Sequence, residues 1–294
     1  MIKRIFWNLY FLTFLNGFLL ATLFYFRMEA DYERELFQAI RSDVNGKVSD
    51  HDSQDSVVIK VMHATHNLLT NREAVFEGKP LGGLKADLLH PTTIDLMTAN
   101  GACGSFSIVL ARLYQGYQFP VRIAQMKANG IYAAHNIVEV KTNHGWAVLD
   151  PLFDIYFVKP DHTLASFTDV QADWPYYRRQ LPNGYDSNYK YAGVRYTNWT
   201  KIPVIFPTVK KILDLTIGKP AADTISLRTY FLRMYDICFG VTLVLLTLVF
   251  FFTLVKLIKA KVFPRKNIPF TFSNILKYLR LRIFERRMPE QSQA

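Results

Sequence analysis

The sequence predicts an α+β domain, in which a helix packs on an antiparallel sheet, flanked by two transmembrane helices. Two long, uncharged apolar stretches lie near the ends of the 294-residue chain, at 5–26 and 237–255. Between them, residues 105–115 show the apolar spacing of a helix. Three strand-like segments follow, at 121–126, 131–141 and 146–149, separated by turn residues. This order is typical of a helix followed by an antiparallel meander.

Each apolar stretch is long enough to cross the hydrocarbon core of a bilayer, which is about 30 Å thick. The first stretch is longer than the core of a typical signal peptide, and no small-residue cleavage site follows it, so we expect an uncleaved anchor. The second stretch is the more apolar of the two. The region between them is long enough for one soluble domain with its own core.

Positive charge is concentrated at the two ends of the chain. Of the net charge of +11, residues 256–294 carry +8, while residues 27–236 are nearly neutral. Basic residues flank the cytoplasmic side of membrane spans, so we expect both termini in the cytoplasm and the central domain outside the cytoplasmic (inner) membrane. Basic ends also indicate contact with membrane lipid rather than with nucleic acid. Residues 270–287 suit either an amphipathic helix on the inner leaflet or a solvated tail.

The expected organisation has six parts. They are a cytoplasmic N-terminus (1–4), a first span (5–26), a juxtamembrane helix with a linker (27–56), an extracytoplasmic domain (57–236), a second span (237–255) and a basic cytoplasmic tail (256–294). The domain ends in an extension rich in Tyr and Trp, from Trp174 to Trp199. Such side chains suit contacts with peptide or sugar, and they equally suit packing near a membrane surface.

Cys103 is the single cysteine of the central domain, and it stands just before the predicted helix. The start of a helix favours an anion, so a thiolate is stabilised there, and the same backbone N–H groups can stabilise an oxyanion. The small neighbours Gly101, Ala102 and Gly104 leave room for a substrate backbone. A lone cysteine is more often a small buried residue, so the interpretation depends on its partners.

A thiol nucleophile needs a base, and the base needs a group that orients it. With a symmetric four-residue loop at 141–144, His135 falls directly opposite Asp150 on the neighbouring strand and on the same face of the sheet. Alternatively, His135 is a half-buried strand residue and Asp150 caps the turn before Pro151.

The pair His63 and His66 has metal-ligand spacing without a third ligand nearby, and we expect neither a metal nor an organic cofactor.

Two segments carry a resemblance to the bacterial transglutaminase-like family of papain-type folds. GACGSFSIVLARLYQGYQFPVRI resembles its nucleophile helix and a Gly-x-Pro-x-Arg-like turn, here with two extra residues. HNIVEVKTNHGWAVLDP resembles its His strand, tight turn, Trp and Asp-Pro signature. The likeness covers roughly residues 84–157 and departs from the family at Asn136, where small or apolar residues are common.

The resemblance implies a papain-like fold in which Cys103 is the nucleophile, His135 the base and Asp150 the orienting residue. It implies acyl transfer at an amide of a peptide or protein outside the cytoplasm, through a thioester on Cys103. If water accepts the acyl group, the protein is a cysteine peptidase or amidase. If an amine accepts it, the protein is a protein-glutamine acyltransferase. Asn100 is a candidate to complete the oxyanion hole. The alternative is a non-catalytic peptide- or glycan-binding module of a cell-envelope assembly that retains the fold.

Overall fold

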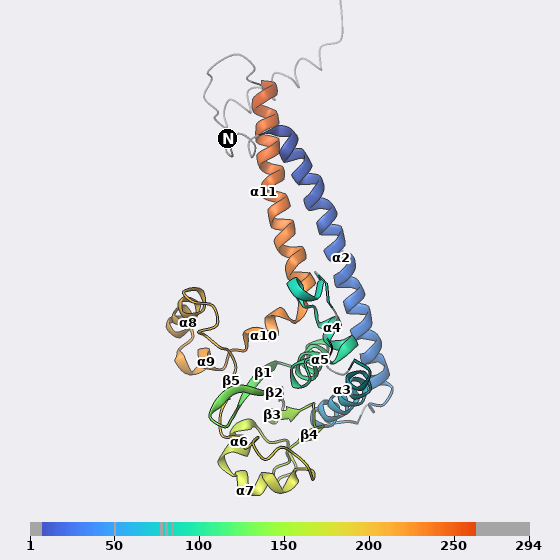
Figure 1. Ribbon diagram of the computed structural model, residues 1–294, viewed down its shortest axis with the longest axis vertical. Coiled ribbons are helices and arrows are strands. Elements are labelled where there is room, and N and C mark those ends of the chain that lie inside the picture. The colour runs from blue at the N-terminus through green and yellow to red at the C-terminus, as the bar shows by residue number, and fades with distance from the viewer. Residues whose placement is uncertain (1–7, 50, 77–78, 80–81, 84, 263–294) are drawn as a thin grey trace, which may run out of the picture. The chain divides into compact units, whose positions relative to one another are not determined.

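The computed structural model describes residues 8–49, 51–76, 79, 82–83 and 85–262. It combines helices with a five-stranded antiparallel sheet, which confirms the predicted α+β class (Figure 1). The chain divides into two compact units, of which the larger is residues 28–237 and the smaller joins the segments before and after it. The expected cytoplasmic N-terminus and the amphipathic or solvated tail at 270–287 lie outside the described residues.

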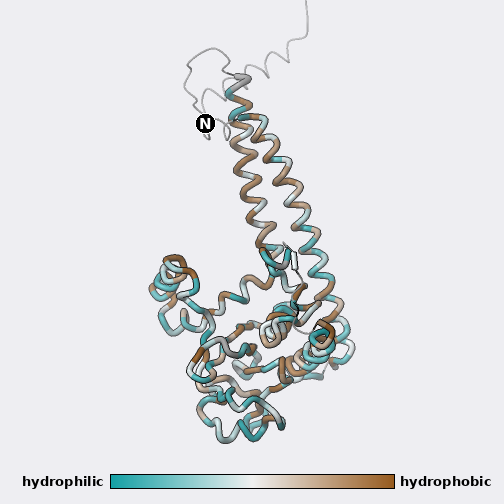
Figure 2. Tube along the Cα trace, in the orientation of Figure 1, coloured by the Kyte–Doolittle hydropathy of each residue, from teal (hydrophilic) through white to brown (hydrophobic). Residues whose placement is uncertain are grey.

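Two helices are long and apolar enough to cross a membrane. They are α2 (Leu9–Asn45) and α11 (Met234–Val262). Figure 2 shows α11 as hydrophobic over most of its length, whereas α2 becomes hydrophilic toward its C-terminal end. In each apolar window only 11% of the residues are buried within the protein. That exposure fits a surface that faces lipid better than it fits the core helix of a soluble protein.

A polar contact joins the two candidate membrane-spanning helices within the smaller unit. The side-chain amide of Asn16 donates to Oγ1 of Thr253 at 2.9 Å and to the carbonyl of Leu12 at 2.8 Å. In hydrocarbon, an unpaired amide is costly, so side-chain hydrogen bonds of this kind favour association of the helices that share them.

The sheet forms the centre of the larger unit. Its strands are β1 (Val121–Ala128), β2 (Ile131–Thr142), β3 (Gly145–Asp150), β4 (Ile155–Tyr156) and β5 (Val194–Arg195). They lie in the order β4-β3-β2-β1-β5, and all neighbours are antiparallel. The first three strands occupy the segments predicted from the sequence, and the meander continues into β4.

Helices and short helical turns make up most of the rest of the larger unit's regular structure in the described chain. They are α3 (Gln54–Phe76), η1 (Lys85–Leu89), α4 (Thr92–Thr98), α5 (Cys103–Gly116), α6 (Phe167–Ala172), α7 (Trp174–Tyr177), η2 (Arg178–Gln180), α8 (Ile205–Thr216), α9 (Lys219–Asp223), α10 (Leu227–Tyr230) and η3 (Phe231–Arg233). Helices α3 and α5 cover one face of the sheet, where Phe106 and Leu110 pack against Val138 and Leu149.

Aromatic side chains from the segment after β4 cover the opposite face. Phe157, Tyr177 and Tyr191 pack there against Ile137 and Val148. Successive residues of a strand point to opposite faces. His135 therefore lies on the aromatic face, two residues before Ile137 on β2.

The hairpin between β2 and β3 differs from the predicted four-residue loop. Its strands pair up to Thr142 and Gly145, which leaves a two-residue turn at Asn143 and His144. Gly145 closes the turn at φ +115°, a conformation that a side chain would strain. The pairing between β2 and β3 is therefore shifted by two residues from the predicted register, and His135 and Asp150 are not directly opposed. A shift of two keeps them on the same face, whereas a shift of one would have separated them.

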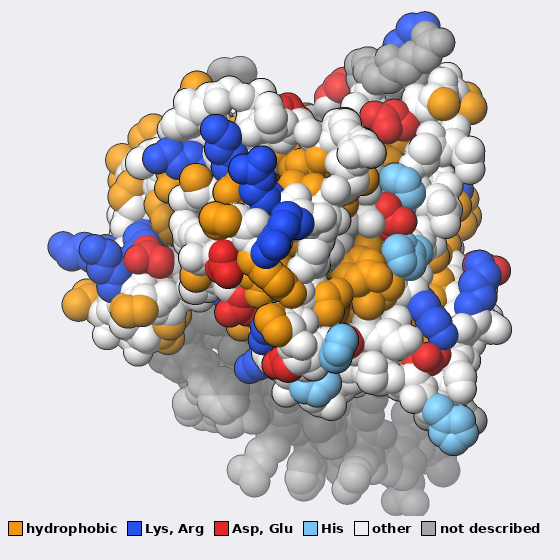
Figure 3. All heavy atoms as spheres, turned by 90° about the horizontal axis from the view of Figure 1, so that it is seen from below, with side chains coloured by type: hydrophobic (Ala, Val, Ile, Leu, Met, Phe, Trp, Pro, Cys, Tyr) orange, Lys and Arg blue, Asp and Glu red, His pale blue; other side chains and the backbone are white. Residues whose placement is uncertain are grey.

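Charged side chains are unevenly spread over this nearly neutral domain. On the face drawn in Figure 3, a row of Lys and Arg side chains runs from the upper left toward the centre among exposed hydrophobic side chains, and other Lys and Arg side chains lie at the right edge. One arginine is fixed inside the fold, because Arg122 donates to Glu139 at 2.8 Å and lies 4.0 Å from the ring centroid of Trp146. Arg122 follows Pro120 in the segment predicted to form a Gly-x-Pro-x-Arg-like turn. Its contacts connect β1 with β2 and β3.

Candidate active site

The turn before α5 is held in a fixed conformation. The backbone N–H of Gly101 donates to Oγ of Ser105 at 2.8 Å, and this hydroxyl donates to Oδ1 of Asp95 at 2.6 Å. A Cβ atom at Gly101 would lie 2.9 Å from that Oγ, so the position needs glycine. Ala102 adopts φ 42° and ψ −118°, a conformation that L-residues rarely adopt. The turn places Cys103 as the first residue of α5, as the sequence predicted.

His135 and Asp150 form a buried hydrogen-bonded pair. Nε2 of His135 lies 2.6 Å from Oδ2 of Asp150. Both residues have no exposed surface. A β-bulge lies immediately before His135, because pairing with β1 jumps from Met126 opposite His135 to Lys127 opposite Tyr132. Bulges of this kind re-aim the side chains beside them.

Two tyrosines of the aromatic extension hold this pair in place. The ring of Tyr189 stacks on the imidazole of His135, with centroids 4.4 Å apart and planes 15° apart. The hydroxyl of Tyr185 donates to Oδ2 of Asp150 at 3.1 Å. The ring of Phe153 packs against His135 and Tyr185, with its centroid 5.7 Å from that of the imidazole and 4.9 Å from that of the Tyr185 ring. These side chains therefore support the site from within the fold.

Asn136 brings a side-chain amide to the thiol. Its Nδ2 lies 3.4 Å from Sγ of Cys103, within reach of a hydrogen bond to sulfur. Its Oδ1 accepts a hydrogen bond from Nη1 of Arg228 at 2.8 Å. Because a guanidinium can only donate, this bond requires Oδ1 to face Arg228 and the NH₂ group to face the sulfur. The departure from the family pattern at position 136 thus supplies a donor beside the nucleophile.

The environment favours a charged pair of thiolate and imidazolium. Burial tends to raise the pKa of Cys103, but His135 and the hydrogen bonds from Asn136 outweigh it, so that the thiol pKa is lowered. Burial tends to lower the pKa of His135, but the Asp150 carboxylate and Cys103 raise it to about 9. The two opposite shifts stabilise the same ionised state.

The remaining polar atoms of the site are the ones that a proton transfer would use. Asp150 occupies Nε2 of His135, so Nδ1 is the nitrogen available to the thiol. Nδ1 is buried and makes no hydrogen bond of normal geometry to any described residue. The backbone N–H of Cys103 likewise has no backbone acceptor in the described chain. With Nδ2 of Asn136, it offers two donors for an oxyanion. The side chain that contacts Sγ belongs to Asn136, not to the candidate Asn100.

The other histidines considered as metal ligands have separate partners. His63 Nδ1 lies 2.7 Å from Asp154, and His66 Nδ1 lies 3.0 Å from the carbonyl of Pro151. No group of three potential ligands that could hold a metal ion occurs within the described part of the chain.

Sequence reasoning identified Cys103, His135 and Asp150, and the structure brings these three together. It missed Asn136, Tyr185, Tyr189 and Arg228. Asn136 adjoins His135 in sequence and stands where the resemblance leads one to expect a small or apolar residue, which is a usable signal. The other three come from distant segments, and nothing in their spacing predicts the contact.

Comparison of the chain with protein families, with curated proteins and with solved structures finds no match.

Proposed function

We propose that the protein is a membrane-anchored, transglutaminase-like thiol enzyme with a papain-like domain. It transfers or hydrolyses the acyl group of an amide through a thioester on Cys103. The observation that carries the proposal is the buried His135–Asp150 pair, 2.6 Å apart, whose imidazole interacts with a thiol at the start of α5. A histidine held by a carboxylate beside a helix-start thiol is the arrangement that nucleophilic acyl transfer needs.

In the first step the thiolate of Cys103 attacks the carbonyl carbon of the amide. The negative charge moves to the carbonyl oxygen, to which the N–H of Cys103 and Nδ2 of Asn136 would donate hydrogen bonds. The imidazolium of His135 then gives its Nδ1 proton to the departing nitrogen. The C–N bond breaks, the amine leaves, and a thioester remains on Cys103.

In the second step His135, now neutral, takes a proton from the acceptor. Water as acceptor gives a carboxylic acid, and a primary amine gives a new amide. In both cases the C–S bond breaks and the thiolate is restored beside the imidazolium. The hydrogen bond between Nε2 and Oδ2 of Asp150 leaves Nδ1 of His135 for the transferred proton.

The proposed location is the cytoplasmic membrane, with both termini in the cytoplasm and the catalytic domain outside. The two apolar helices support membrane insertion, and the excess of Lys and Arg after the second span supports the orientation. Labelling of Cys103 in intact cells with a membrane-impermeant maleimide tests the orientation. We expect labelling without lysis, and labelling that requires lysis would contradict it.

The proposed reaction predicts an acyl group on Cys103. Full-length protein in detergent would be incubated with a peptide mixture from the cell envelope, and the peptide that contains Cys103 analysed by mass spectrometry. We expect a mass increase that hydroxylamine removes, because hydroxylamine cleaves thioesters. Incorporation of a biotinylated primary amine into peptide would show the amine acceptor. The Cys103→Ser variant, which forms an ester instead, gives the matched control.

The rival function is a non-catalytic binding module. It predicts that Cys103→Ala folds and fully replaces the wild-type protein in a deletion strain. That result, together with no adduct on Cys103 from any peptide pool, would overturn the enzyme proposal.

A further inference from the structure

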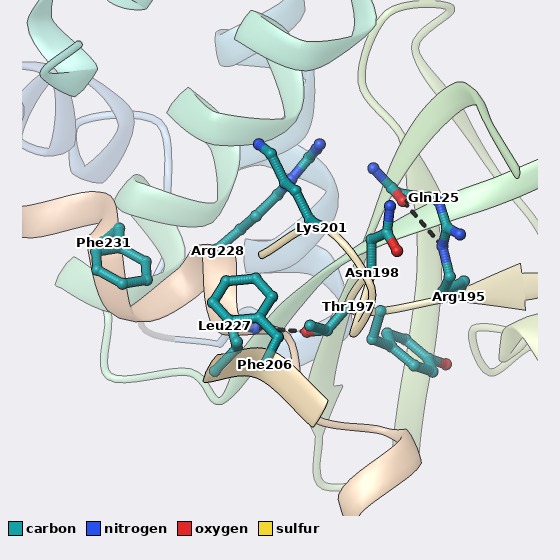
Figure 4. Close-up of a pocket in the computed structure, with 10 residues that line it drawn as sticks. Gln125, Arg195, Thr197, Asn198, Lys201, Phe206, Leu227, Arg228 and Phe231 are labelled. Atoms are coloured by element: carbon teal, nitrogen blue, oxygen red, sulfur yellow. Dashed lines mark hydrogen bonds between the residues drawn. The ribbon is translucent and has the colours of Figure 1, made fainter. Parts of the chain in front are cut away.

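A pocket of about 360 Å³ lies beside the thiol site. Its lining includes Gln125, Arg195, Lys201, Phe206, Leu227 and Arg228. Three of these described lining residues are cationic, and none is Asp or Glu. In the view of Figure 4, the polar ends of Lys201, Arg228 and Arg195 follow one side of the pocket, and the apolar Phe206 and Leu227 lie on the other.

In the described part of the chain, the three cations of this pocket have no carboxylate partner. Arg195 donates from Nε and Nη2 to Oε1 of Gln125, at 3.2 and 2.8 Å. Arg228 donates to Asn136, and the side chain of Lys201 is exposed. Among the described residues, no carboxylate forms an ion pair with any of the three. Burial lowers the pKa of Arg228, the charge of Cys103 raises it, and Arg195 lowers it, so the two guanidinium groups repel each other. A bound anion would relieve that repulsion.

The pocket is connected directly to the nucleophile. Arg228 lines it and donates to Oδ1 of Asn136 at 2.8 Å, while Nδ2 of Asn136 lies 3.4 Å from Sγ of Cys103. A group bound to Arg228 therefore lies one side-chain amide away from the reacting sulfur. Guanidinium groups bind carboxylates with paired hydrogen bonds, and Arg228 has donors beyond the one used for Asn136.

We propose that this cationic pocket is a substrate subsite that binds a carboxylate next to the reacting amide. Its apolar wall accommodates the carbon chain that carries the carboxylate, and its cationic wall binds the charge. The substrate class is thus an acidic peptide or amide rather than a neutral or basic one. The role as a substrate subsite rests on the proposed thiol chemistry, whereas the binding of an anion does not.

Two alkylating reagents that differ in charge test the subsite without knowledge of the substrate. Iodoacetate carries a carboxylate, and iodoacetamide of nearly the same size is neutral. Their rate constants with Cys103 would be measured on full-length protein in detergent, by mass spectrometry of the peptide that holds Cys103. The ratio of the two rates reports the charge beside the sulfur, and a free cysteine peptide measured in parallel gives the reference.

We expect the iodoacetate-to-iodoacetamide ratio to exceed that of the free peptide and to fall with rising salt. Lys201→Gln should lower the ratio about twofold, and Arg195→Gln together with Lys201→Gln should lower it further. Lys201 is exposed, so its replacement leaves folding intact. Arg178→Gln is the matched control, because Arg178 is exposed and lies outside the pocket lining. Arg228 is left intact because its loss would also release Asn136.

The outcomes separate the two proposals. A ratio equal to that of the free peptide, unchanged by Lys201→Gln and by the double variant, would overturn the subsite even when iodoacetamide reacts fast. Slow reaction with both reagents, at the rate of an ordinary thiol, would instead count against the activated nucleophile. In that case a ratio that still falls in the two variants would support an anion-binding pocket without the substrate role.

Discussion

Nε2 of His135 lies 2.6 Å from Oδ2 of Asp150, although the two residues are not directly opposed on β2 and β3. They are diagonal neighbours on the same face of the sheet, close enough for a side-chain hydrogen bond between a His and an Asp. Both are fully buried, so solvent does not weaken the interaction. This contact fixes the tautomer of the imidazole and leaves Nδ1 as the nitrogen available to the thiol.

Asp150→Asn keeps the shape of the side chain but removes the charge that raises the pKa of His135. We expect the reaction of Cys103 with iodoacetamide near neutral pH to slow strongly. In a serine-protease triad the equivalent change lowers kcat by about 10⁴, and a thiol site should lose less because thiolate forms more readily. Asp154→Asn is the matched control, because Asp154 pairs with the partly exposed His63. Equal rates in both variants would contradict the role of Asp150.

Cys103, His135 and Asp150 should act as one unit. Cys103→Ala and His135→Ala should each abolish function in a deletion strain, and their effects should not add, because both act on one step. His144→Ala is the control. His144 lies in the β2–β3 turn, 52% exposed, and its ion pair with Asp55 contributes about 1 kcal/mol or less to stability. If His144→Ala lost function as severely as His135→Ala, the loss in His135→Ala would be explained by a structural defect and not by a catalytic role of His135.

Tyr185 should support the carboxylate of Asp150. Tyr185→Phe removes one hydrogen bond to a charged acceptor, and such bonds contribute about 1.5–3 kcal/mol net. We expect the rate of Cys103 alkylation to fall about tenfold, since Asp150 then holds the imidazolium less well. Tyr176→Phe makes the same chemical change outside the site. An alkylation rate in Tyr185→Phe equal to that of Tyr176→Phe would exclude this contribution.

The upper pH limit of acyl transfer should follow His135. Its pKa is raised to about 9, so the imidazolium persists from low pH and is lost as pH rises through about 9. Formation of the thioester needs the imidazolium proton for the leaving nitrogen, so the rate of acylation should fall above that pH. Alkylation of Cys103 needs no such proton and should not fall there. A parallel fall of both rates would point to unfolding rather than to titration of His135.

Much of this site was predictable because its signals are local. The apolar spacing of 105–115, the turn residues and the short β segments place Cys103 before a helix and His135 and Asp150 on adjacent strands. The register was wrong, because the strands continue to Thr142 and Gly145 and leave a two-residue turn. The predicted contact between His135 and Asp150 is nevertheless present, because an error of two residues keeps both side chains on the same face of the sheet.

The supporting residues were not predictable, because they come from distant parts of the chain. Tyr185 and Tyr189 reach the pair from the aromatic extension, and Arg228 reaches Asn136 across 92 positions. Aromatic composition alone was compatible with substrate or membrane contacts. In the structure, several of these rings instead pack on the sheet around His135, which only the tertiary fold determines.

The central claim is that His135 activates Cys103, and the pH dependence of Cys103 alkylation tests it most directly. Full-length protein in detergent would react with iodoacetamide across the pH range, with His135→Gln as the comparison and the Cys103 peptide followed by mass spectrometry. Because the thiol pKa is lowered, we predict that the wild-type rate reaches its plateau below about pH 8.5, the value of a free thiol. We predict that the rate of His135→Gln rises only above it. Profiles that coincide, with both rates rising only above that pH, would contradict the account.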